Sequence, residues 1–317
     1  MDSCSTPFEQ REKIRVEALR IGFDACSFAR IDEVEPNMRE AYRRWLDEGR
    51  QAQMDYLGNY LDLRENPRQL YPGAQTMICV ALNYYPTRFQ PRENPQFAYY
   101  AYGQDYHEVM RRKLRQLAVF VATLSGDEGR VCCDTAPVRE RYWAARAGLG
   151  FIGKNGQLII PGKGSFFFLG ELLTSLELPP DDPQPSRCGD CSRCMEQCPT
   201  GAIVAPGVID ARLCISCQTI ENRGDISPFV ADRMGNRVYG CDTCQAGCPW
   251  NRQAIPSPHP EFAPDEELLA LDAERFEAMT PEDFGRLFRR SAVKRAKYAG
   301  LRRNFEIWKK NRAHKEE

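Results

Sequence analysis

The residues of this chain best suited to redox chemistry are its cysteines. Nine of the fourteen lie in three short runs between Cys188 and Cys248. The first run reads C-x2-C-x2-C-x3-C-P, the second reads C-x2-C, and the third reads C-x2-C-x3-C-P. The first spacing suits a pair of [4Fe–4S] clusters, because three of its cysteines reach one cluster and the cysteine before proline reaches the other.

The three runs therefore predict two [4Fe–4S] clusters that share ligands across the outer runs. The first cluster takes Cys188, Cys191, Cys194 and Cys248. The second takes Cys198, Cys241 and Cys244, and its fourth ligand is either Cys214 or Cys217. Pairs of C-x2-C also occur in zinc sites, but the longer run before proline is not a zinc pattern. Disulfides would require an oxidising compartment, and the sequence shows no signal that would direct the chain to one.

The composition indicates an ordinary globular protein with room for two or three domains. The 317 residues are 42% hydrophobic and 27% charged. Residues 1–4 lack the basic and apolar pattern of a signal peptide. The longest apolar run, 166–176, is too short to cross a bilayer and contains Glu171. We therefore expect a cytoplasmic protein that makes no membrane contact.

Charge is distributed unevenly along the chain. The net charge is −1, yet residues 286–317 carry twelve Lys and Arg against three Glu, which leaves this tail at +9. Such a tail favours a polyanionic partner, and nucleic acid is one. A solvated basic helix is the alternative interpretation of the same residues.

Hydrophobic periodicity and turn residues divide the chain into elements. We expect helices over 7–22, 36–49, 105–125, 138–147, 266–278, from 280 onward and 291–312, and strands over 23–29, 76–85, 131–135, 158–160 and 165–176. Pro-rich joints over 179–185 and 255–264 separate three segments. The predicted domains are therefore 1–178, 179–255 and 256–317.

Polar residues at element boundaries mark a second candidate site. Asp134 follows an apolar strand, and His107 lies at the start of a helix, although both positions also suit helix capping. The glycine-rich segment 150–156 matches neither a Walker A loop nor a dinucleotide fingerprint. Asp105-x-His107-x-x-Met110 is half of a corrinoid-binding D-x-H-x-x-G pattern, so a histidine ligand to cobalt is not expected.

Several segments together resemble the epoxyqueuosine reductase family. They are Asp105-Tyr106-His107, the CDTAPVRER segment 133–141, the GLGFIGKN segment 148–155, the first cysteine run, and YGCDTCQAGCPWN at 239–251. Members of that family reduce the epoxide of epoxyqueuosine, a wobble base of certain tRNAs, to the alkene of queuosine. They use two [4Fe–4S] clusters and cobalamin bound without a lower protein ligand, and their cluster region is similar to that of reductive dehalogenases.

The resemblance implies roles for particular residues. It makes Asp134 the proton donor and selects Cys214 over Cys217 as the last ligand of the second cluster. It implies cobalamin contacts at Leu57, Phe97, Asp134, Leu158, Leu169, Ser216 and Cys241. It implies contacts to substrate or to the tRNA anticodon stem-loop at Asp105, Tyr106, His107, Arg223, Lys294, Arg295, Arg302 and Arg303.

The fold that the resemblance implies is α+β. It comprises an N-terminal α/β cobalamin-binding domain, a ferredoxin-like domain with two [4Fe–4S] clusters, and a short C-terminal helical segment. Family members often end in HEAT-like helical repeats, and residues 291–311 resemble one such unit.

The implied reaction is chemically consistent with these residues. Removal of an epoxide oxygen as water takes two electrons and two protons. Co(I) cobalamin would deliver the electrons, and the clusters would resupply it from an external electron donor. The leaving oxygen needs an acid, and we expect burial at the strand end to raise the pKa of Asp134 so that it stays protonated near neutrality.

Two other functions fit part of the sequence. One is a dehalogenase-like corrinoid reductase of a small molecule, although such enzymes usually carry an export signal. The other is a non-catalytic electron-transfer protein, against which Asp134 and the glycine-rich loop argue. Corrin absorption in reconstituted protein would separate an enzyme from a carrier.

Overall fold

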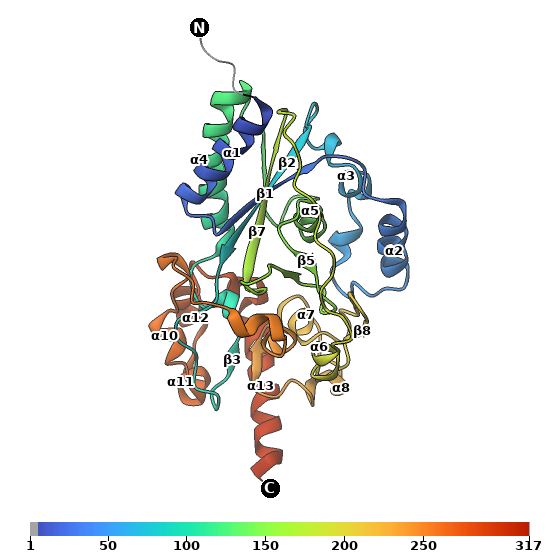
Figure 1. The fold of residues 1–317 in the computed structure, drawn as a ribbon. Coiled ribbons are helices and arrows are strands. Elements are labelled where there is room, and N and C mark those ends of the chain that lie inside the picture. The colour runs from blue at the N-terminus through green and yellow to red at the C-terminus, as the bar shows by residue number, and fades with distance from the viewer. Residues whose placement is uncertain (1–5, 317) are drawn as a thin grey trace.

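The computed structural model describes residues 6–316, and the side chains of residues 6–313. The segment 1–4, which bears on the signal-peptide expectation, lies outside the described residues. The first half of the chain is built on a four-stranded sheet with the order β1-β2-β7-β4 (Figure 1). Its strands are β1 (Ala25–Arg30), β2 (Thr76–Asn83), β7 (Phe167–Thr174) and β4 (Arg130–Cys132).

Both faces of this sheet are covered, which explains why β2 and β7 are apolar nearly throughout. Helices α1 (Pro7–Ile21) and α4 (Tyr106–Ser125) pack on one face, and α5 (Glu140–Arg146) packs on the other. Gly170 of β7 permits the close approach of α4, since a Cβ there would lie 2.8 Å from the sulfur of Met110. The sheet and its helices therefore form two cores, one on each face.

The strand pairings correct one part of the fold prediction. Every pair in the four-stranded sheet is antiparallel, so the first segment is not built from the parallel βαβ units that the α/β description implies. A mixed α+β fold is what the structure has. Burial on both faces makes strands apolar in either direction, so the sequence pattern of β2 and β7 does not distinguish parallel from antiparallel pairing.

Most predicted elements are present with shifted ends. The helix expected over 36–49 is α2 (Pro36–Asp47), and the helix expected from 138 begins at Glu140. The helix expected over 266–278 is two helices, α10 (Glu266–Leu269) and α11 (Ala273–Ala278), because Asp272 caps the second. The last predicted helix is a short 3-10 turn, η6 (Ala292–Ala296), followed by α13 (Lys297–Glu316).

The cysteine-rich segment consists of short elements joined by tight loops. They are α6 (Arg193–Glu196), β8 (Ile203–Ala205), β9 (Val208–Ile209), α7 (Ile215–Ile220), α8 (Pro228–Ala231), β10 (Arg237–Tyr239) and α9 (Thr243–Ala246). The remaining elements are η1 (Asp55–Gly58), α3 (Leu61–Glu65), η2 (Pro67–Gln69), β3 (Gln96–Phe97), η3 (Tyr99–Ala101), β5 (Phe151–Ile152), β6 (Leu158–Ile159), η4 (Pro249–Gln253), η5 (Pro260–Phe262) and α12 (Pro281–Leu287).

The three predicted domains are interlocked. Strand β3 of the first segment pairs in parallel with β10 of the cysteine-rich segment. Phe97 of β3 lies in one hydrophobic core with Tyr239 of β10 and with Phe276 and Phe288 of the C-terminal helices. The buried amide of Asn304 on α13 donates to the backbone carbonyls of Thr219 on α7 and Val238 on β10. The domain boundaries remain a prediction from sequence.

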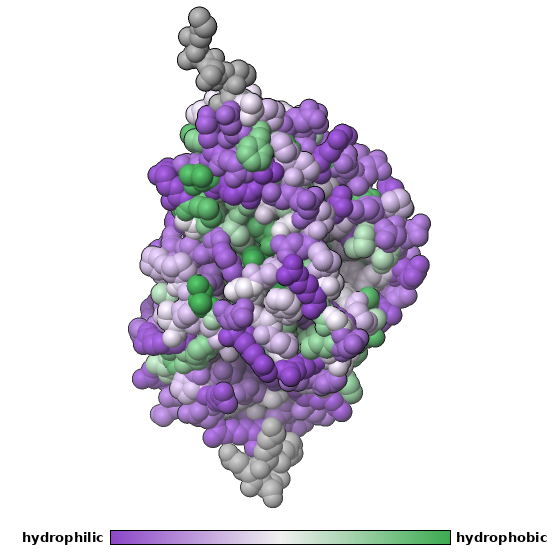
Figure 2. All heavy atoms as spheres, viewed as in Figure 1, coloured by the Kyte–Doolittle hydropathy of each residue, from purple (hydrophilic) through white to green (hydrophobic). Residues whose placement is uncertain are grey.

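The face of the molecule in Figure 2 is mostly hydrophilic, with hydrophobic residues scattered among the hydrophilic ones. Among the described residues, no helix combines the length and the apolar character needed to span a bilayer.

Candidate functional site

Asp134 projects from a sharp turn at the end of β4. Its φ is +55°, a left-handed conformation that aspartate tolerates better than most residues. The backbone N–H of Asp134 donates to the carboxylate of Glu140 on α5, and the N–H of Thr135 donates to the carbonyl of Cys133 at 2.6 Å. This turn carries the Asp134 side chain out of the sheet, where it is 52% exposed.

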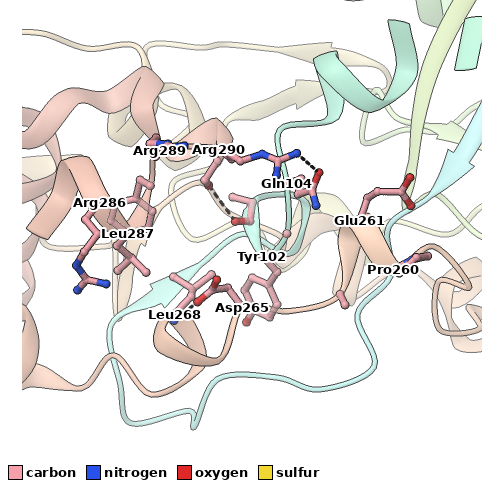
Figure 3. A pocket seen from close by; sticks show the side chains of 15 residues that line it. Tyr102, Gln104, Pro260, Glu261, Asp265, Leu268, Arg286, Leu287, Arg289 and Arg290 are labelled. Carbon is pink, nitrogen blue, oxygen red and sulfur yellow. Dashed lines mark hydrogen bonds between the residues drawn. The ribbon is translucent and has the colours of Figure 1, made fainter. Parts of the chain in front are cut away.

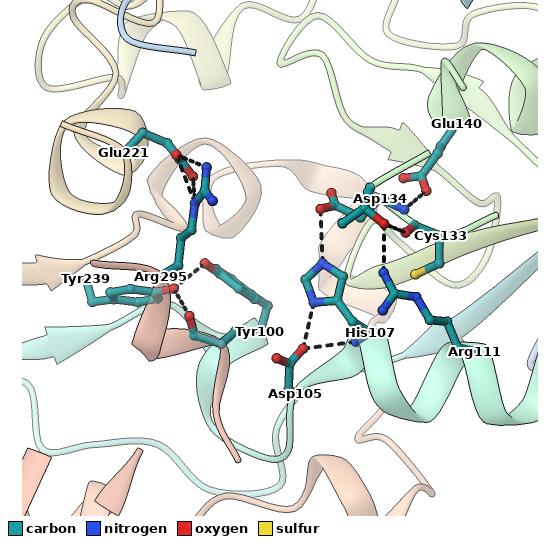
Figure 4. A network of polar contacts seen from close by, with 12 residues as sticks. Tyr100, Asp105, His107, Arg111, Cys133, Asp134, Glu140, Glu221, Tyr239 and Arg295 are labelled. Atoms are coloured by element: carbon teal, nitrogen blue, oxygen red, sulfur yellow. Dashed lines mark hydrogen bonds and ion pairs between the residues drawn. The ribbon is translucent and has the colours of Figure 1, made fainter. Parts of the chain in front are cut away.

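His107 lies between two carboxylates at the start of α4. Asp105 caps the helix by accepting from the backbone N–H of His107 at 3.0 Å. The same carboxylate oxygen lies 2.6 Å from Nδ1 of the His107 ring, and Oδ2 of Asp134 lies 3.0 Å from Nε2 (Figure 4). The Tyr106 ring stacks on Phe168 at 4.3 Å and on His107 at 4.0 Å, so packing fixes the imidazole.

These contacts reverse the protonation expected for Asp134. Burial lowers the pKa of His107, but its hydrogen bonds to Asp105 and Asp134 outweigh burial and raise that pKa to about 9. Burial likewise raises the pKa of Asp134, but the hydrogen bond and charge of His107 bring it below its ordinary value. The expectation of a raised pKa at Asp134 is therefore wrong. At neutral pH the proton of the pair resides on His107.

The carboxylate of Glu140 was missed by the sequence analysis. It belongs to the 133–141 segment, but its bond to the Asp134 backbone depends on a turn that the sequence does not reveal. Burial, opposed in part by that bond, raises the pKa of Glu140 to about 7. A group with this pKa changes protonation near neutrality, and its carboxylate contacts the turn that carries Asp134.

The predicted ligands of the first cluster lie together. Burial first, and then the neighbouring thiols of Cys248 and Cys188, raise the pKa of Cys194. The thiols that act in the same way on Cys248 are Cys188 and Cys191. Cys248 therefore returns from the third run to the three cysteines of the first run, as the spacing predicts.

The predicted ligands of the second cluster form a separate group. After burial, the thiols that raise the pKa of Cys244 are Cys241, Cys214 and Cys198. Cys217 is not among them, and its own charged neighbours are Cys214 and Glu221. All described cysteines are free, and no three metal-binding side chains of the described residues converge as they would on a single ion. The donor set is thus two groups of four thiols, which fits two cubane clusters.

Comparisons with known proteins agree with these two centres. Residues 64–135, which include Asp105, His107 and Asp134, match a family model described as epoxyqueuosine reductase QueG, DUF1730. Residues 187–251 match a 4Fe-4S double cluster binding domain. The epoxyqueuosine reductase of Cellulophaga algicola is 40% identical over 308 residues, which cover 96% of this chain and 100% of that protein. This chain belongs to the epoxyqueuosine reductase family. It is accordingly an oxidoreductase with a double-cluster domain.

Other members of the family extend the comparison. The epoxyqueuosine reductase of Escherichia coli K12 is 38% identical over 305 residues, which cover 93% of this chain and 79% of that protein. A solved epoxyqueuosine reductase with an epoxyqueuosine-modified tRNA stem loop has a TM-score of 0.88 at 30% identity, covering 96% of this chain and 81% of that one. The Bacillus subtilis enzyme, solved with its catalytic aspartate loop swung out of the active site, has a TM-score of 0.87 at 30% identity, with coverages of 96% and 82%.

The residues that the family resemblance assigns to cobalamin differ in accessibility. Leu57, Leu169, Ser216 and Cys241 are half-buried, and Leu158 is nearly buried. Phe97 is only 2% exposed, its ring is enclosed by the aromatic core, and its backbone N–H donates to the side chain of Gln90. Tyr56, beside Leu57, has its pKa raised to about 12 by burial and then by the charge of Glu221, with a smaller contribution from Asp134. The segment around η1 therefore faces the region of Asp134 and α7.

Most of the arginines that the resemblance assigns to tRNA are engaged within the protein. Arg295 forms a bidentate pair with Glu221, and Arg223 donates to the carbonyl of Arg295 at 2.6 Å. Arg302 binds Glu277, and Arg303 donates to backbone carbonyls near α7. Arg223, Arg295 and Arg303 attach the C-terminal segment to the cysteine-rich segment, whereas Arg302 joins α11 to α13 within the C-terminal segment. Lys294 is exposed.

A separate cavity of about 380 Å³ lies beside this site (Figure 3). It is lined by segments 101–104, 260–268 and 286–291, and it contains neither Asp134 nor a cluster cysteine. Arg290 connects the two places, because its side chain donates to Gln104 at 3.0 Å and its carbonyl accepts from the N–H of Asp105 at 2.6 Å. The basic tail thus contacts the loop that positions His107.

Proposed function

We propose that this protein reduces epoxyqueuosine to queuosine at the wobble position of tRNA, in the cytoplasm, with Asp134 delivering a proton to the epoxide oxygen. The observation that carries the proposal is the Asp105–His107–Asp134 chain of hydrogen bonds, which places a carboxylate at the end of β4 beside a protonated imidazole. Family membership supplies the substrate class, and this geometry supplies the acid.

The cysteines and the cobalamin residues fit the implied redox groups. Cys188, Cys191, Cys194 and Cys248 would hold one [4Fe–4S] cluster, and Cys198, Cys214, Cys241 and Cys244 the other. Both ring nitrogens of His107 are bonded to carboxylates, so this imidazole would position the acid and would not bind the corrinoid metal. Leu57, Phe97, Leu158, Leu169, Ser216 and Cys241 would hold that corrinoid. When bound, the clusters would pass electrons from an external donor to the corrinoid, which would supply two of them to the epoxide.

Residues of the chain donate protons to the epoxide oxygen. Loss of the epoxide oxygen breaks two C–O bonds, forms one C=C bond and releases water, which consumes two electrons and two protons. His107 donates its Nε2 proton to Asp134, and Asp134 passes the proton to the oxygen as the first C–O bond opens. Asp105 stays ionised and keeps His107 oriented, as a carboxylate partner does for a catalytic imidazole. Asp134 must therefore touch the epoxide oxygen in the complex.

An unpaired anticodon base suits this site, since it can enter a pocket without the cost of opening a duplex. The tRNA phosphates would contact the basic tail, through exposed residues such as Lys294 and Arg289 beside the Figure 3 cavity. Arg223, Arg302 and Arg303 contribute mainly by holding the tail in place. This arrangement predicts tRNA affinity that decreases steeply with salt.

The test is anaerobic reconstitution with iron, sulfide, cobalamin and a strong reductant, followed by nucleoside analysis of epoxyqueuosine-containing tRNA. Conversion to queuosine by the wild type and not by Asp134→Asn supports the proposal. Full turnover by Asp134→Asn would remove Asp134 from its role. Reduction of a small halogenated compound without conversion of the tRNA would favour the dehalogenase-like alternative.

A further inference from the structure

The turn that carries Asp134 is an exposed segment between two buried residues. Cys133 is 2% exposed and Val138 is 5% exposed, whereas Asp134 and Thr135 between them are exposed. The left-handed φ of Asp134 is a conformation that persists where the surrounding structure holds it. An exposed polar turn gains little from apolar packing, so the position of the proposed acid depends on its polar contacts.

Helix α4 is attached to this turn at two consecutive residues (Figure 4). His107 and Arg111 are four positions apart, so both side chains lie on one face of α4. Nε2 of His107 lies 3.0 Å from the Asp134 carboxylate, and Arg111 donates to Oγ1 of Thr135 at 2.7 Å. The backbone N–H of Thr135 donates in turn to the carbonyl of Cys133, next to the end of β4. The two side chains of α4 therefore hold the turn from one side.

One of these attachments does not change when a proton is transferred. The bond between His107 and Asp134 loses its proton in the proposed reaction, and Asp134 must also contact the epoxide oxygen. The bond from the Asp134 backbone to Glu140 joins residues only six positions apart, and the Glu140 carboxyl group changes protonation near neutrality. Arginine stays protonated at every working pH, and a threonine hydroxyl accepts a hydrogen bond without titrating. The Arg111–Thr135 bond is therefore independent of pH and of the protonation of the acid.

We propose that Arg111 is a positioning residue that holds the Asp134 turn in the cleft through its bond to Thr135. In this role the guanidinium does not contact the epoxide. It keeps the Asp134 carboxyl group within reach of His107 and of the substrate while protons pass between them. Loss of the bond would release the turn, and Asp134 would then lie beside His107 for less of the time. This inference rests on the proposed function, because the position of Asp134 matters only if it delivers a proton.

Release of the turn would change the pKa of His107 in a defined direction. Burial lowers this pKa, but the bonds to Asp105 and Asp134 outweigh burial and raise it to about 9. Departure of Asp134 removes one of these bonds, so the pKa should fall. Loss of the Arg111 charge alone would act the other way, because removal of a nearby cation raises the pKa of an imidazole. The sign of the change therefore separates positioning from a charge effect. The other charged groups around the pair are Glu140, Lys294 and Arg295.

Four variants test the bond. Arg111→Met and Thr135→Val remove it with little change in side-chain size, Thr135→Ser keeps the hydroxyl, and Arg115→Met is the matched control. Arg115 lies four positions further along α4, is exposed, and makes no hydrogen bond or ion pair within the described residues. We expect R111M and T135V each to lower single-turnover conversion of epoxyqueuosine tRNA about tenfold. The double variant should be no slower than either one, because both changes remove the same bond.

The controls define what a positioning role predicts. T135S should recover most of the rate, and R115M should match the wild type. Iron content, cobalamin absorption and the Kd for tRNA should be unchanged in all four variants. A lower rate that is explained by weaker tRNA binding would overturn the proposal, because Arg111 would then act on the substrate.

Nuclear magnetic resonance titration of His107 gives a readout that does not depend on turnover. The reconstituted protein is titrated without tRNA, and His107→Gln assigns the signal among the three histidines of the chain. The pKa of His107 should be lower than in the wild type in R111M and T135V, and unchanged in T135S and R115M. A wild-type titration in T135V would overturn the proposal. If R111M does not fold, T135V and T135S carry the test. If T135V lowers the pKa but the wild type never converts the tRNA, the proposed function fails while the positioning role of Arg111 stands.

Discussion

The cysteine-rich segment and the Asp134 site hold their chemistry in different ways. The cluster ligands lie within 61 residues, and their spacing predicts seven of the eight members of the two groups that the structure brings together, leaving open Cys214 or Cys217. The Asp134 site is formed by residues of α4, of α5 and of the turn after β4. No short sequence motif predicts the contacts among these three elements. A metal cluster requires donors at fixed distances, which a loop supplies locally. A proton site depends on charges contributed from separate elements, so its behaviour is a tertiary property.

Substitution of Cys214 and of Cys217 is the strongest test of the proposed cluster ligands. We expect Cys214→Ala to lose one cluster, from about eight irons per chain to about four, and to abolish turnover. Iron analysis and electron paramagnetic resonance of anaerobic protein measure this. Cys217→Ala is the matched control, since its thiol lies outside the group around Cys244, and loss of iron in that variant would contradict the assignment.

Substitution of the proposed acid should have the next largest effect. Asp134→Asn keeps the size of the side chain but removes its proton chemistry, and we expect single-turnover conversion to decrease by about 10²- to 10⁴-fold. Iron content and cobalamin absorption should not change. Asp232→Asn, at an exposed aspartate in the cluster segment, is the control and should retain wild-type rates.

His107 should control the pH dependence at alkaline pH. Because its pKa in the folded protein is about 9, above its ordinary 6.5, the activity that needs its proton should decline as pH rises through about 9. Protonated His107 also contributes to the free energy of unfolding. This contribution is complete below about pH 6.5 and is lost as the pH rises through about 9. Solvent screens the half-exposed Asp134, so this contribution is on the order of 1 kcal/mol.

His107→Gln tests this assignment through pH profiles of activity and of thermal unfolding. The variant should lose the alkaline limb of the rate profile, and its deficit in stability should be larger at pH 6 than at pH 10. An unchanged alkaline limb would show that another group carries the proton.

The smallest effect should come from the basic tail. Lys294→Ala removes one exposed cation, and we expect severalfold weaker tRNA binding and a salt dependence reduced by about one phosphate contact. Arg303→Ala should instead lower the unfolding temperature, because its guanidinium bonds backbone carbonyls of Asn222 and Gln218. Fluorescence titration at several salt concentrations separates the two kinds of residue.

The sequence was most informative where chemistry and local spacing coincide. It predicted the helix that begins beside His107 and the long apolar strands, and it singled out Asp134, whereas the cap of that helix is Asp105. The sequence predicted a raised pKa for Asp134, whereas the pKa is lowered. The apolar strand before Asp134 indicates burial, but the contact with His107 is tertiary and cannot be inferred from the sequence. The sequence counted the tail arginines as free charges, since their partners Glu221 and Glu277 lie 74 and 25 residues away in the chain.

The short parallel pair of β3 and β10 has a consequence for how the molecule is made. Residues 96–97 obtain their partner only when residues 237–239 have been synthesised. The first 178 residues therefore leave the ribosome with β3 unpaired, and only the first two cysteine runs are in the growing chain before β10 is made, because Cys241, Cys244 and Cys248 follow it. Each proposed cluster takes ligands from the third run, so the chain completes both ligand sets only after it has made the strand that pairs with β3.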